Sequence, residues 1–410
     1  MQFRSIVGQE SVKGQLVQLV EHNRLSHALL FLGKEGSGSL LLALAFAQYI
    51  VCEKVNPQPA THNLQPKNHK LPEGFHELII NDSCGECPAC KKANELIHPD
   101  IHFSYPVVTK KSGEKPSSTD YIREWRDFIK QNPYGNAYDW LQSIDAENKQ
   151  GNITANECNE IIRKLNLKSF ESKYKVLIMW LPEFLGKEGN KLLKLIEEPP
   201  PNTLFLFVAE NEGLVLPTIL SRTQLIKIPR LGKAELEAAL EINAGVQPEK
   251  ARQVAAVAEG NYREALLLLQ HAEDDWQSLL REWLNAILRS GPLAQVKWIE
   301  ETARKGREKQ KQFIKYFIHL LEMAIRVRLI VPDEKGYNAE SGAGTRNKDE
   351  YDFAERLNKL CSIGQQEAII NELNKATYYI ERNANAKMLF HALSIRLLHI
   401  INNKTLILIN

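Results

Sequence analysis

The segment from Gly33 to Leu40 is the feature that most constrains how this chain can fold. It reads Gly-Lys-Glu-Gly-Ser-Gly-Ser-Leu, follows the apolar run 28–32 and opens a helical apolar pattern over 40–51. A strand, a glycine-rich turn and a helix form the setting of a phosphate-binding loop, because the N–H groups of the turn and of the helix N-terminus converge on an anion. The sequence therefore predicts such a unit here.

The side chains that such a loop uses for ATP chemistry are replaced. The pattern is Gly, four residues, Gly, Lys and then Ser or Thr; Gly33 and Gly38 fit it, but Ser39 and Leu40 take the last two positions. A serine brings no charge to the outer phosphates, and a leucine cannot ligate magnesium. The backbone, with Gly36, can still cradle phosphate. We expect a degenerate loop that could hold nucleotide without hydrolysing it; an ordinary glycine turn is the alternative.

Composition favours an ordinary soluble protein of two or three domains. The chain has 410 residues, 25% of them charged, and a net charge of +2, which argues against a surface coated throughout for nucleic acid. No apolar run reaches the length of a membrane span, and the first residues do not begin a secretory signal. Six cysteines are too few for a disulfide scaffold in a chain of this length. We expect a cytoplasmic protein.

Three cysteines at C-x-x-C-x-x-C spacing, Cys84, Cys87 and Cys90, predict a metal site. Tetrahedral zinc needs a fourth ligand. Cys52 is the first candidate, because it ends the helix that precedes the polar stretch 53–83. Four histidines compete with it: His62, His69, His76 and His98. Because nothing indicates an open coordination position, we expect structural zinc, with an iron–sulfur cluster as the alternative.

Strand and helix patterns alternate over residues 1–230, which predicts an α/β fold with a parallel sheet and helices on both faces. The polar stretches 53–83 and 131–152 are expected to be loop-like insertions. Beyond Pro229 the patterns are helical only. We therefore expect three domains, at 1–230, 231–272 and 273–410.

The strand predicted at 175–180 lacks the acidic residue that holds magnesium in a working P-loop ATPase. Only Glu183 is acidic, three residues too late. We expect Glu183 to be a solvated loop carboxylate.

Five segments carry a resemblance to a known family. They are Val7-Gly8-Gln9, His27 to Phe31, the three-cysteine motif, Leu192-Leu193-Lys194 with Glu197-Glu198-Pro199-Pro200, and Leu216 to Arg222. With them the chain resembles the bacterial clamp-loader subunits of the AAA+ family, and among these the delta-prime group of DNA polymerase III, whose own nucleotide site is degenerate. The resemblance is specific over about residues 1–270 and rests on architecture beyond them.

The resemblance implies a P-loop AAA+ fold with a helical lid at 231–272 and an all-helical collar at 273–410. It also implies a hetero-oligomeric ring in DNA replication, with gamma/tau and delta subunits, the sliding clamp and primer–template DNA as partners. The family's Ser-Arg-Cys motif maps onto Ser221-Arg222-Thr223, so Arg222 would act as an arginine finger in trans on a neighbour's ATP.

Two further positions bear on the resemblance. Ala209 stands where active members carry a polar sensing residue, and Arg263 matches the lid arginine that senses nucleotide. The resemblance thus implies a non-hydrolysing subunit that is no enzyme by itself but belongs to the DNA polymerase III holoenzyme. The alternatives are an active ATPase of the gamma/tau type and a zinc-dependent DNA-binding protein.

Overall fold

The computed structural model describes residues 1–56, 81–109, 116–146, 149–270, 276–329, 345–381 and 384–402. The chain divides into two compact units, Met1–Gly245 with Ala258–Ala265, and Val246–Val257 with Leu266–Asn410. Each unit has a hydrophobic core of its own. The domain boundaries expected at 230 and 272 stay a prediction.

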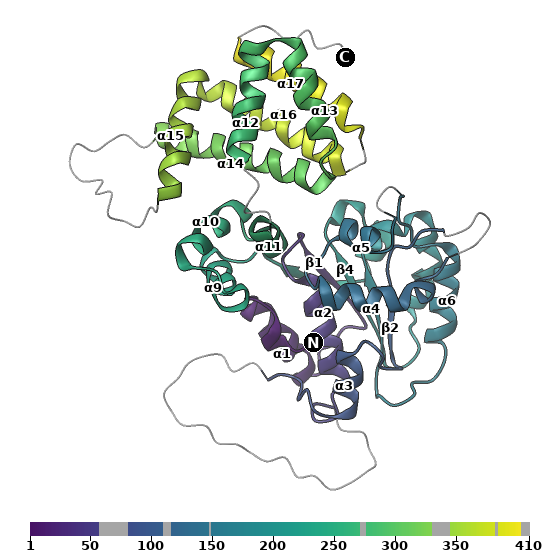
Figure 1. Cartoon of the computed structure of the whole chain (residues 1–410). Helices are drawn as coiled ribbons and strands as arrows, with labels where there is room; N and C mark the ends of the chain where they lie inside the picture. The colour runs from purple at the N-terminus through teal and green to yellow at the C-terminus, as the bar shows by residue number, and fades with distance from the viewer. Residues whose placement is uncertain are drawn as a thin grey trace, which may run out of the picture. The chain divides into compact units, whose positions relative to one another are not determined.

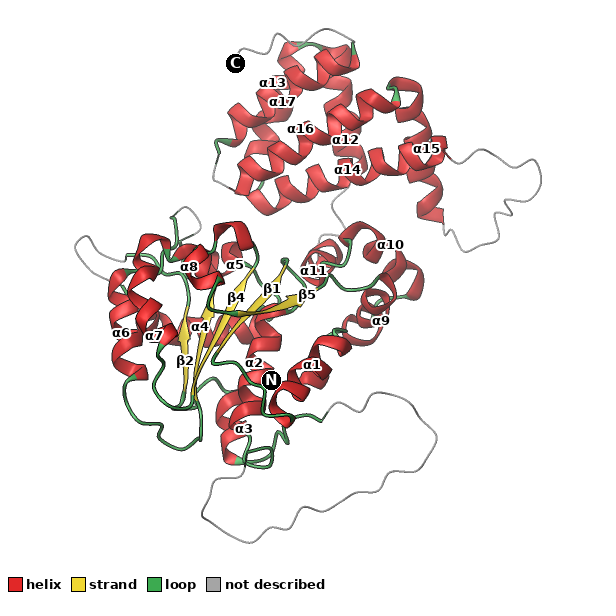
Figure 2. Ribbon diagram, turned by 180° about the vertical axis from the view of Figure 1, so that it is seen from behind, coloured by secondary structure: helices red, strands yellow, loops and turns green. Residues whose placement is uncertain are grey.

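The first unit is built on a five-stranded sheet in the order β2-β3-β4-β1-β5, in which every neighbouring pair is parallel (Figure 2). The strands are β1 (Ala28–Gly33), β2 (Ile101–Ser104), β3 (Lys175–Trp180), β4 (Thr203–Ala209) and β5 (Gln224–Ile228). All residues of β3 and β4 are buried, as near-continuous apolar strands covered on both faces require.

Successive residues of each strand point to opposite faces, so the sheet contributes to two cores. Leu29 and Phe31 face one core, whereas Ala28 and Leu30 face the other. The first core includes residues of α1 (Glu10–Glu21), α2 (Ser39–Val51), α3 (Pro88–Asn94), α4 (Ile122–Gln131) and α5 (Ala137–Ser143). The second includes residues of α6 (Ala155–Leu165), α7 (Leu193–Glu197) and α8 (Pro217–Leu220). Helices therefore cover both faces of a parallel sheet, which confirms the predicted fold class.

Short helical turns join these elements. They are η1 (Phe3–Ser5), η2 (Ser118–Tyr121), η3 (Pro182–Phe184), η4 (Gly186–Leu192) and η5 (Glu212–Leu214).

The prediction of a loop over 131–152 was wrong, because α5 forms within it. Asn136 caps this helix by accepting the N–H of Asp139 at 3.0 Å, and the Asp139 carboxylate accepts the N–H of Asn136 at 3.1 Å. The buried Trp140 donates its indole N–H to the Pro106 carbonyl at 2.6 Å. The polar composition of 131–152 thus concealed α5, a helix that is held in place by the buried side chain of Trp140. Of the other predicted insertion, 53–83, residues 57–80 lie outside the described part of the chain.

The C-terminal part of the chain is helical, as predicted. Its helices are α9 (Lys233–Ala244), α10 (Pro248–Ala258), α11 (Tyr262–Gln270), α12 (Trp276–Asn285), the π-helical η6 (Ala286–Ser290), α13 (Pro292–Ala303), α14 (Arg307–Leu329), α15 (Thr345–Leu360), α16 (Ile363–Glu381) and α17 (Ala386–Ile401) (Figure 1). Trp283 and Trp298 stack at 4.9 Å inside the second unit. In the part of the chain that the structure describes, no helix is both long and apolar enough to cross a membrane.

Trp140→Ala should destabilise the first unit by about 3–5 kcal/mol, because it removes a fully buried indole that packs on Tyr105 and Trp125. Urea unfolding followed by far-UV circular dichroism measures the loss. Gln142→Ala, on the exposed side of the same helix, is the matched control and should change stability by less than about 0.5 kcal/mol. Equal effects of the two substitutions would show that α5 is not anchored by Trp140.

Candidate functional site

The predicted strand, turn and helix are present around the glycine loop. β1 ends at Gly33, and α2 begins at Ser39. Gly36 and Gly38 have φ angles of 73° and 85°, in the left-handed region that glycine adopts without a steric penalty. Gly38 is the N-cap of α2. The first N–H groups of this helix have no partner within the helix and are directed toward the glycine loop.

Leu40, at the position where the sequence pattern of a phosphate-binding loop has Ser or Thr, is a core residue. Its side chain is buried in the first hydrophobic core, and Ser39 beside it is buried as well. The loop is also tied to the start of the chain, because the Gln9 amide donates to the carbonyls of Ser37 at 3.1 Å and Pro229 at 2.7 Å. The sequence around the loop therefore serves packing where an ATPase would place catalytic side chains.

Residues just before and at the start of α11 contact the glycine loop directly. The N–H of Tyr262 donates to the Gly36 carbonyl at 3.2 Å. Asn261 also approaches Gly36 closely: its Oδ1 is 1.8 Å from the point that a Cβ on Gly36 would occupy. A side chain at position 36 would collide with Asn261, so this approach requires glycine.

Arg263 is engaged by two carboxylates from different parts of the first unit. Its Nη1 donates to Glu35 in the loop at 2.9 Å, and its Nε and Nη2 donate to the two oxygens of Asp139 in α5 at 2.5 and 2.6 Å. The guanidinium group is nearly buried, with 5% of the side chain exposed. The residue predicted to sense nucleotide thus lies at the loop, but its donors are directed to carboxylates of its own chain. We call Glu35, Asp139 and Arg263 the carboxylate clamp.

An aromatic pair, Tyr134 and Tyr262, adjoins the carboxylate clamp. The two rings pack edge to face at 4.7 Å. The Tyr134 hydroxyl accepts the N–H of Val7 at 3.0 Å, and its ring lies 3.3 Å from where a Cβ on Gly38 would stand. Burial raises the pKa of Tyr134 to about 12, so the phenol is neutral. This pair could not be predicted from the sequence, because nothing in the spacing of Tyr134 and Tyr262 links them to the loop.

Glu183 is not the solvated carboxylate that the sequence predicted. Its Oε1 accepts the N–H groups of Glu210 at 2.6 Å and Asn211 at 2.9 Å, just after β4. Its Oε2 is buried and has no hydrogen-bond partner among the described residues. Burial raises the pKa of this carboxyl group, although the backbone donors and, more weakly, the charge of Lys34 oppose the shift. The acid bridges the ends of β3 and β4.

Arg222 lies in a different place, at the end of α8, where its side chain is one-third exposed. Its Nε donates to Glu197 Oε1 at 2.6 Å, and its Nη2 contacts the same oxygen. Its Nη1 donates to the Thr218 carbonyl at 2.8 Å and to the Ser221 hydroxyl at 3.1 Å. The sequence analysis quoted Glu197 for the family resemblance but did not foresee that it would orient Arg222.

The four predicted cysteines lie together. The sulfur atoms of Cys52, Cys84, Cys87 and Cys90 are all within 4.8 Å of one another, although residues 53–83 separate Cys52 from the other three in the sequence. In the described part of the chain, this is the group of side chains that could hold a metal ion. Of the competing histidines, His98 lies apart, beside Glu171 at 3.4 Å, and the other three fall outside the described residues.

The cysteine cluster fits a tetrahedral metal site. Four thiolates around zinc, each at about 2.3 Å from it, would lie about 3.8 Å from one another, and the sulfurs of Cys84 and Cys90 are 3.9 Å apart. The N–H groups of Cys84 and Cys87 donate to the sulfurs of Cys52 and Cys84 at 3.4 and 3.3 Å. The pKa of Cys52 is lowered, chiefly because the Cys90 thiol donates to it. Such donors stabilise the thiolate form that metals bind.

The fold and the glycine loop define a protein of the P-loop type with a helical C-terminal part. The family model for "DNA polymerase III, delta subunit" matches residues 8–232. This is more than half of the chain, and the chain therefore belongs to that family.

Among its relatives, the chain is 26% identical to DNA polymerase III subunit delta' of Bacillus subtilis over 65% of its own length and 60% of that protein's. It is 23% identical to DNA polymerase III subunit tau of the same organism, over 75% of this chain and 44% of tau. It thus spans less than two-thirds of either relative. A gamma subunit-related protein of Thermotoga maritima has a TM-score of 0.37 at 14% identity, over 93% of this chain and 98% of that one.

Arg263→Ala should cost about 3–5 kcal/mol of stability, because it leaves the carboxylates of Glu35 and Asp139 without their shared cation. Arg230→Ala is the matched control: Arg230 also pairs with a glutamate, Glu259, but both side chains are more than half exposed. This control should lose less than about 1 kcal/mol. Urea unfolding measures both. Similar small losses would mean that the carboxylate clamp does not hold the loop.

Proposed function

We propose that this chain is a non-hydrolysing subunit of a DNA polymerase III clamp loader, in which Arg222 acts on the ATP of a neighbouring subunit. The observation that carries the proposal is the state of its own loop. The lysine and the metal ligand are absent, Leu40 is a core residue, and the carboxylate clamp occupies Arg263. The family membership supports the assignment to DNA polymerase III.

The partners follow from the same proposal. They are gamma/tau and delta subunits, the sliding clamp and primer–template DNA, within a cytoplasmic replication complex. The C-terminal helices would serve as the collar that joins subunits, and residues 231–272 as the lid. The chain would have no enzymatic activity by itself.

The physical role of Arg222 would be to stabilise the charge that develops on a transferring phosphoryl group. Its guanidinium is exposed enough to meet a neighbouring subunit, and Glu197, Ser221 and Thr218 fix its orientation. A phosphate oxygen would compete with Glu197 for the same donors. Such an arginine lowers the barrier only for a nucleotide supplied from outside the chain, which agrees with a degenerate loop of its own.

Arg222→Ala should lower the DNA-stimulated ATPase rate of the reconstituted assembly by about a thousandfold, while the ring still forms. The assay combines this chain with gamma/tau, delta, clamp and primed DNA, and size-exclusion chromatography checks assembly. Arg163→Ala is the control, because Arg163 pairs with Glu160 on the exposed side of α6 and should leave the rate unchanged. An ATPase rate of the Arg222→Ala assembly equal to that of the parent assembly would show that Arg222 is not an arginine finger.

The second candidate, an active ATPase of the gamma/tau type, has one observation in its favour. Glu183 is buried at the end of the sheet, and Lys34 of the loop acts on its charge. Turnover of ATP by the isolated chain distinguishes the two candidates. Turnover that Glu183→Gln or Ser39→Ala abolishes would replace our proposal, whereas the proposal requires none.

We also propose that Cys52, Cys84, Cys87 and Cys90 hold a structural zinc ion. The ion would tie the end of α2 to α3, and it would supply stability rather than chemistry, since four thiolates leave no open position.

Metal analysis of the purified chain should find one zinc per molecule, lost in Cys52→Ser and retained in Cys158→Ser. Cys158 is the matched control, because it is a buried cysteine outside the cluster. Removing the metal with a chelator should lower the unfolding temperature of the parent chain. Iron with visible absorption would instead support the iron–sulfur alternative, and equal zinc in both variants would exclude Cys52 as a ligand.

A further inference from the structure

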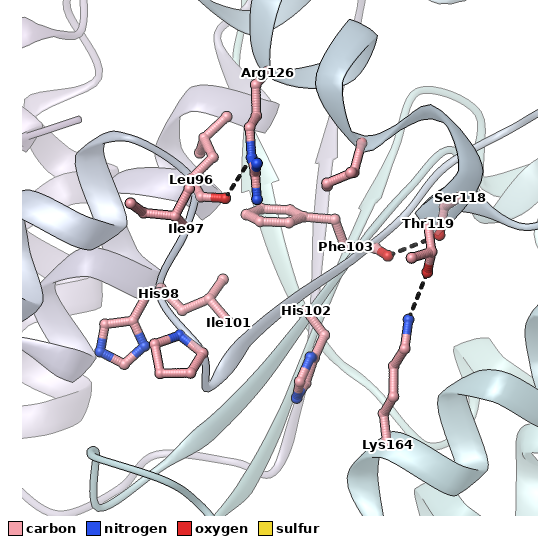
Figure 3. A pocket seen from close by; sticks show the side chains of 12 residues that line it. Leu96, Ile97, His98, Ile101, His102, Phe103, Ser118, Thr119, Arg126 and Lys164 are labelled. Atoms are coloured by element: carbon pink, nitrogen blue, oxygen red, sulfur yellow. Dashed lines mark hydrogen bonds between the residues drawn. The ribbon is translucent and has the colours of Figure 1, made fainter.

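A pocket of about 240 Å³ lies beside the edge strand β2, away from the loop and the cysteines (Figure 3). Segment 96–103 forms one side, η2 and the start of α4 form another, and Lys164 of α6 closes it. Half of the twelve lining residues are apolar, namely Leu96, Ile97, Pro99, Ile101, Phe103 and Ile122. Nothing in the proposed clamp-loader role uses this pocket.

Two cations reach into the pocket from opposite sides, with Phe103 between them (Figure 3). Arg126 donates its Nε to the Leu96 carbonyl at 3.1 Å, and Lys164 donates to the Thr119 hydroxyl at 2.7 Å. Within the described residues, neither cation has a carboxylate partner. The pocket therefore carries uncompensated positive charge on an apolar wall.

Acidic groups near the pocket are engaged by other residues. Glu157 accepts the N–H and the hydroxyl of the lining residue Ser118 at 2.8 and 2.5 Å. The buried Asp100 accepts the N–H groups of Phe170, Glu171 and Ser172 at 2.5 to 2.8 Å. Glu171 contacts Lys92 at 2.5 Å and His98 at 3.4 Å. His102 adds no charge at neutral pH, since burial and then Lys164 lower its pKa to about 4.

One apolar side chain of the pocket lining is exposed: Ile97 is 51% exposed. Asp100, between the lining residues Pro99 and Ile101, also holds the turn that carries Phe170, which is 81% exposed. An exposed apolar side chain beside two cations offers a partner both apolar and charged contacts.

We propose that this pocket binds an acidic segment of a partner protein, which packs one large apolar side chain against the apolar wall at Phe103 and pairs its carboxylates with Arg126 and Lys164. The volume is below the 300–1,000 Å³ or so of sites for drug-sized ligands, and it suits one side chain of the size of leucine or phenylalanine. Two separated cations on an apolar wall also differ from the closely spaced phosphate contacts of a nucleic-acid surface.

The test selects peptides from a random display library on the full-length chain and measures their binding by fluorescence anisotropy. We expect selected peptides to share acidic residues on both sides of one Leu, Ile, Met or Phe. The double variant Arg126→Glu with Lys164→Glu should weaken their binding by at least about tenfold. The matched control, Arg123→Glu with Lys168→Glu, reverses two exposed charges on α4 and after α6 that do not line the pocket, and it should change binding less than about twofold.

A second variant, Ile97→Asp, tests the apolar wall and should also weaken binding, while circular dichroism confirms that each variant is folded. Selection of no peptide, or of peptides that bind the pocket variants as well as the parent, would overturn the proposal. A labelled single-stranded oligonucleotide serves as the competing probe. If the double variant weakens binding of the oligonucleotide but not of the peptides, the pocket surface binds phosphate groups and our proposal is wrong. None of these outcomes depends on the clamp-loader role.

Discussion

The organisation of the first unit depends on one guanidinium group held between two carboxylates. Arg263 joins Glu35 of the glycine loop to Asp139 of α5, two residues that lie more than a hundred positions apart in the chain. Because burying a charge is costly unless it is paired, the three side chains are stable only together. They bring the loop, α5 and the start of α11 to one place, and Asn261 and Tyr262 then contact Gly36.

This arrangement explains how the glycine loop keeps its shape with Ser39 and Leu40 at its end. Gly36 and Gly38 have positive φ angles, and Asn261 approaches too closely for any side chain at position 36. A Cβ on Gly33 would lie 2.5 Å from the Ser37 hydroxyl oxygen. Leu40 packs in the first hydrophobic core. Packing and backbone geometry therefore suffice to hold the loop in this conformation.

The features that could be predicted from the sequence are local in origin. The strand, turn and helix around Gly36 follow from hydrophobic period and glycine placement, and Cys84, Cys87 and Cys90 follow from spacing. The partners of these residues could not be predicted in the same way. Asp139 and Tyr134 lie in the polar stretch 131–152, which was predicted to be a loop. The helix α5 forms there because the side chain of Trp140 packs in the first hydrophobic core. Glu183 was misjudged for the same reason, since its burial depends on the backbone that follows β4.

The two arginines singled out by the sequence differ in what it would cost to free them. Arg263 is nearly buried and makes three contacts with two carboxylates, so its release would leave paired negative charge in a poorly solvated site, at a cost of about 3–5 kcal/mol. Arg222 is one-third exposed and faces a single, half-exposed carboxylate, and surface pairs of this kind contribute only about 0–1 kcal/mol. If the proposed function holds, a phosphate of a neighbouring subunit would displace Glu197 at that cost. Burial holds Arg263 at its own loop, whereas the side chain of Arg222 stays partly exposed.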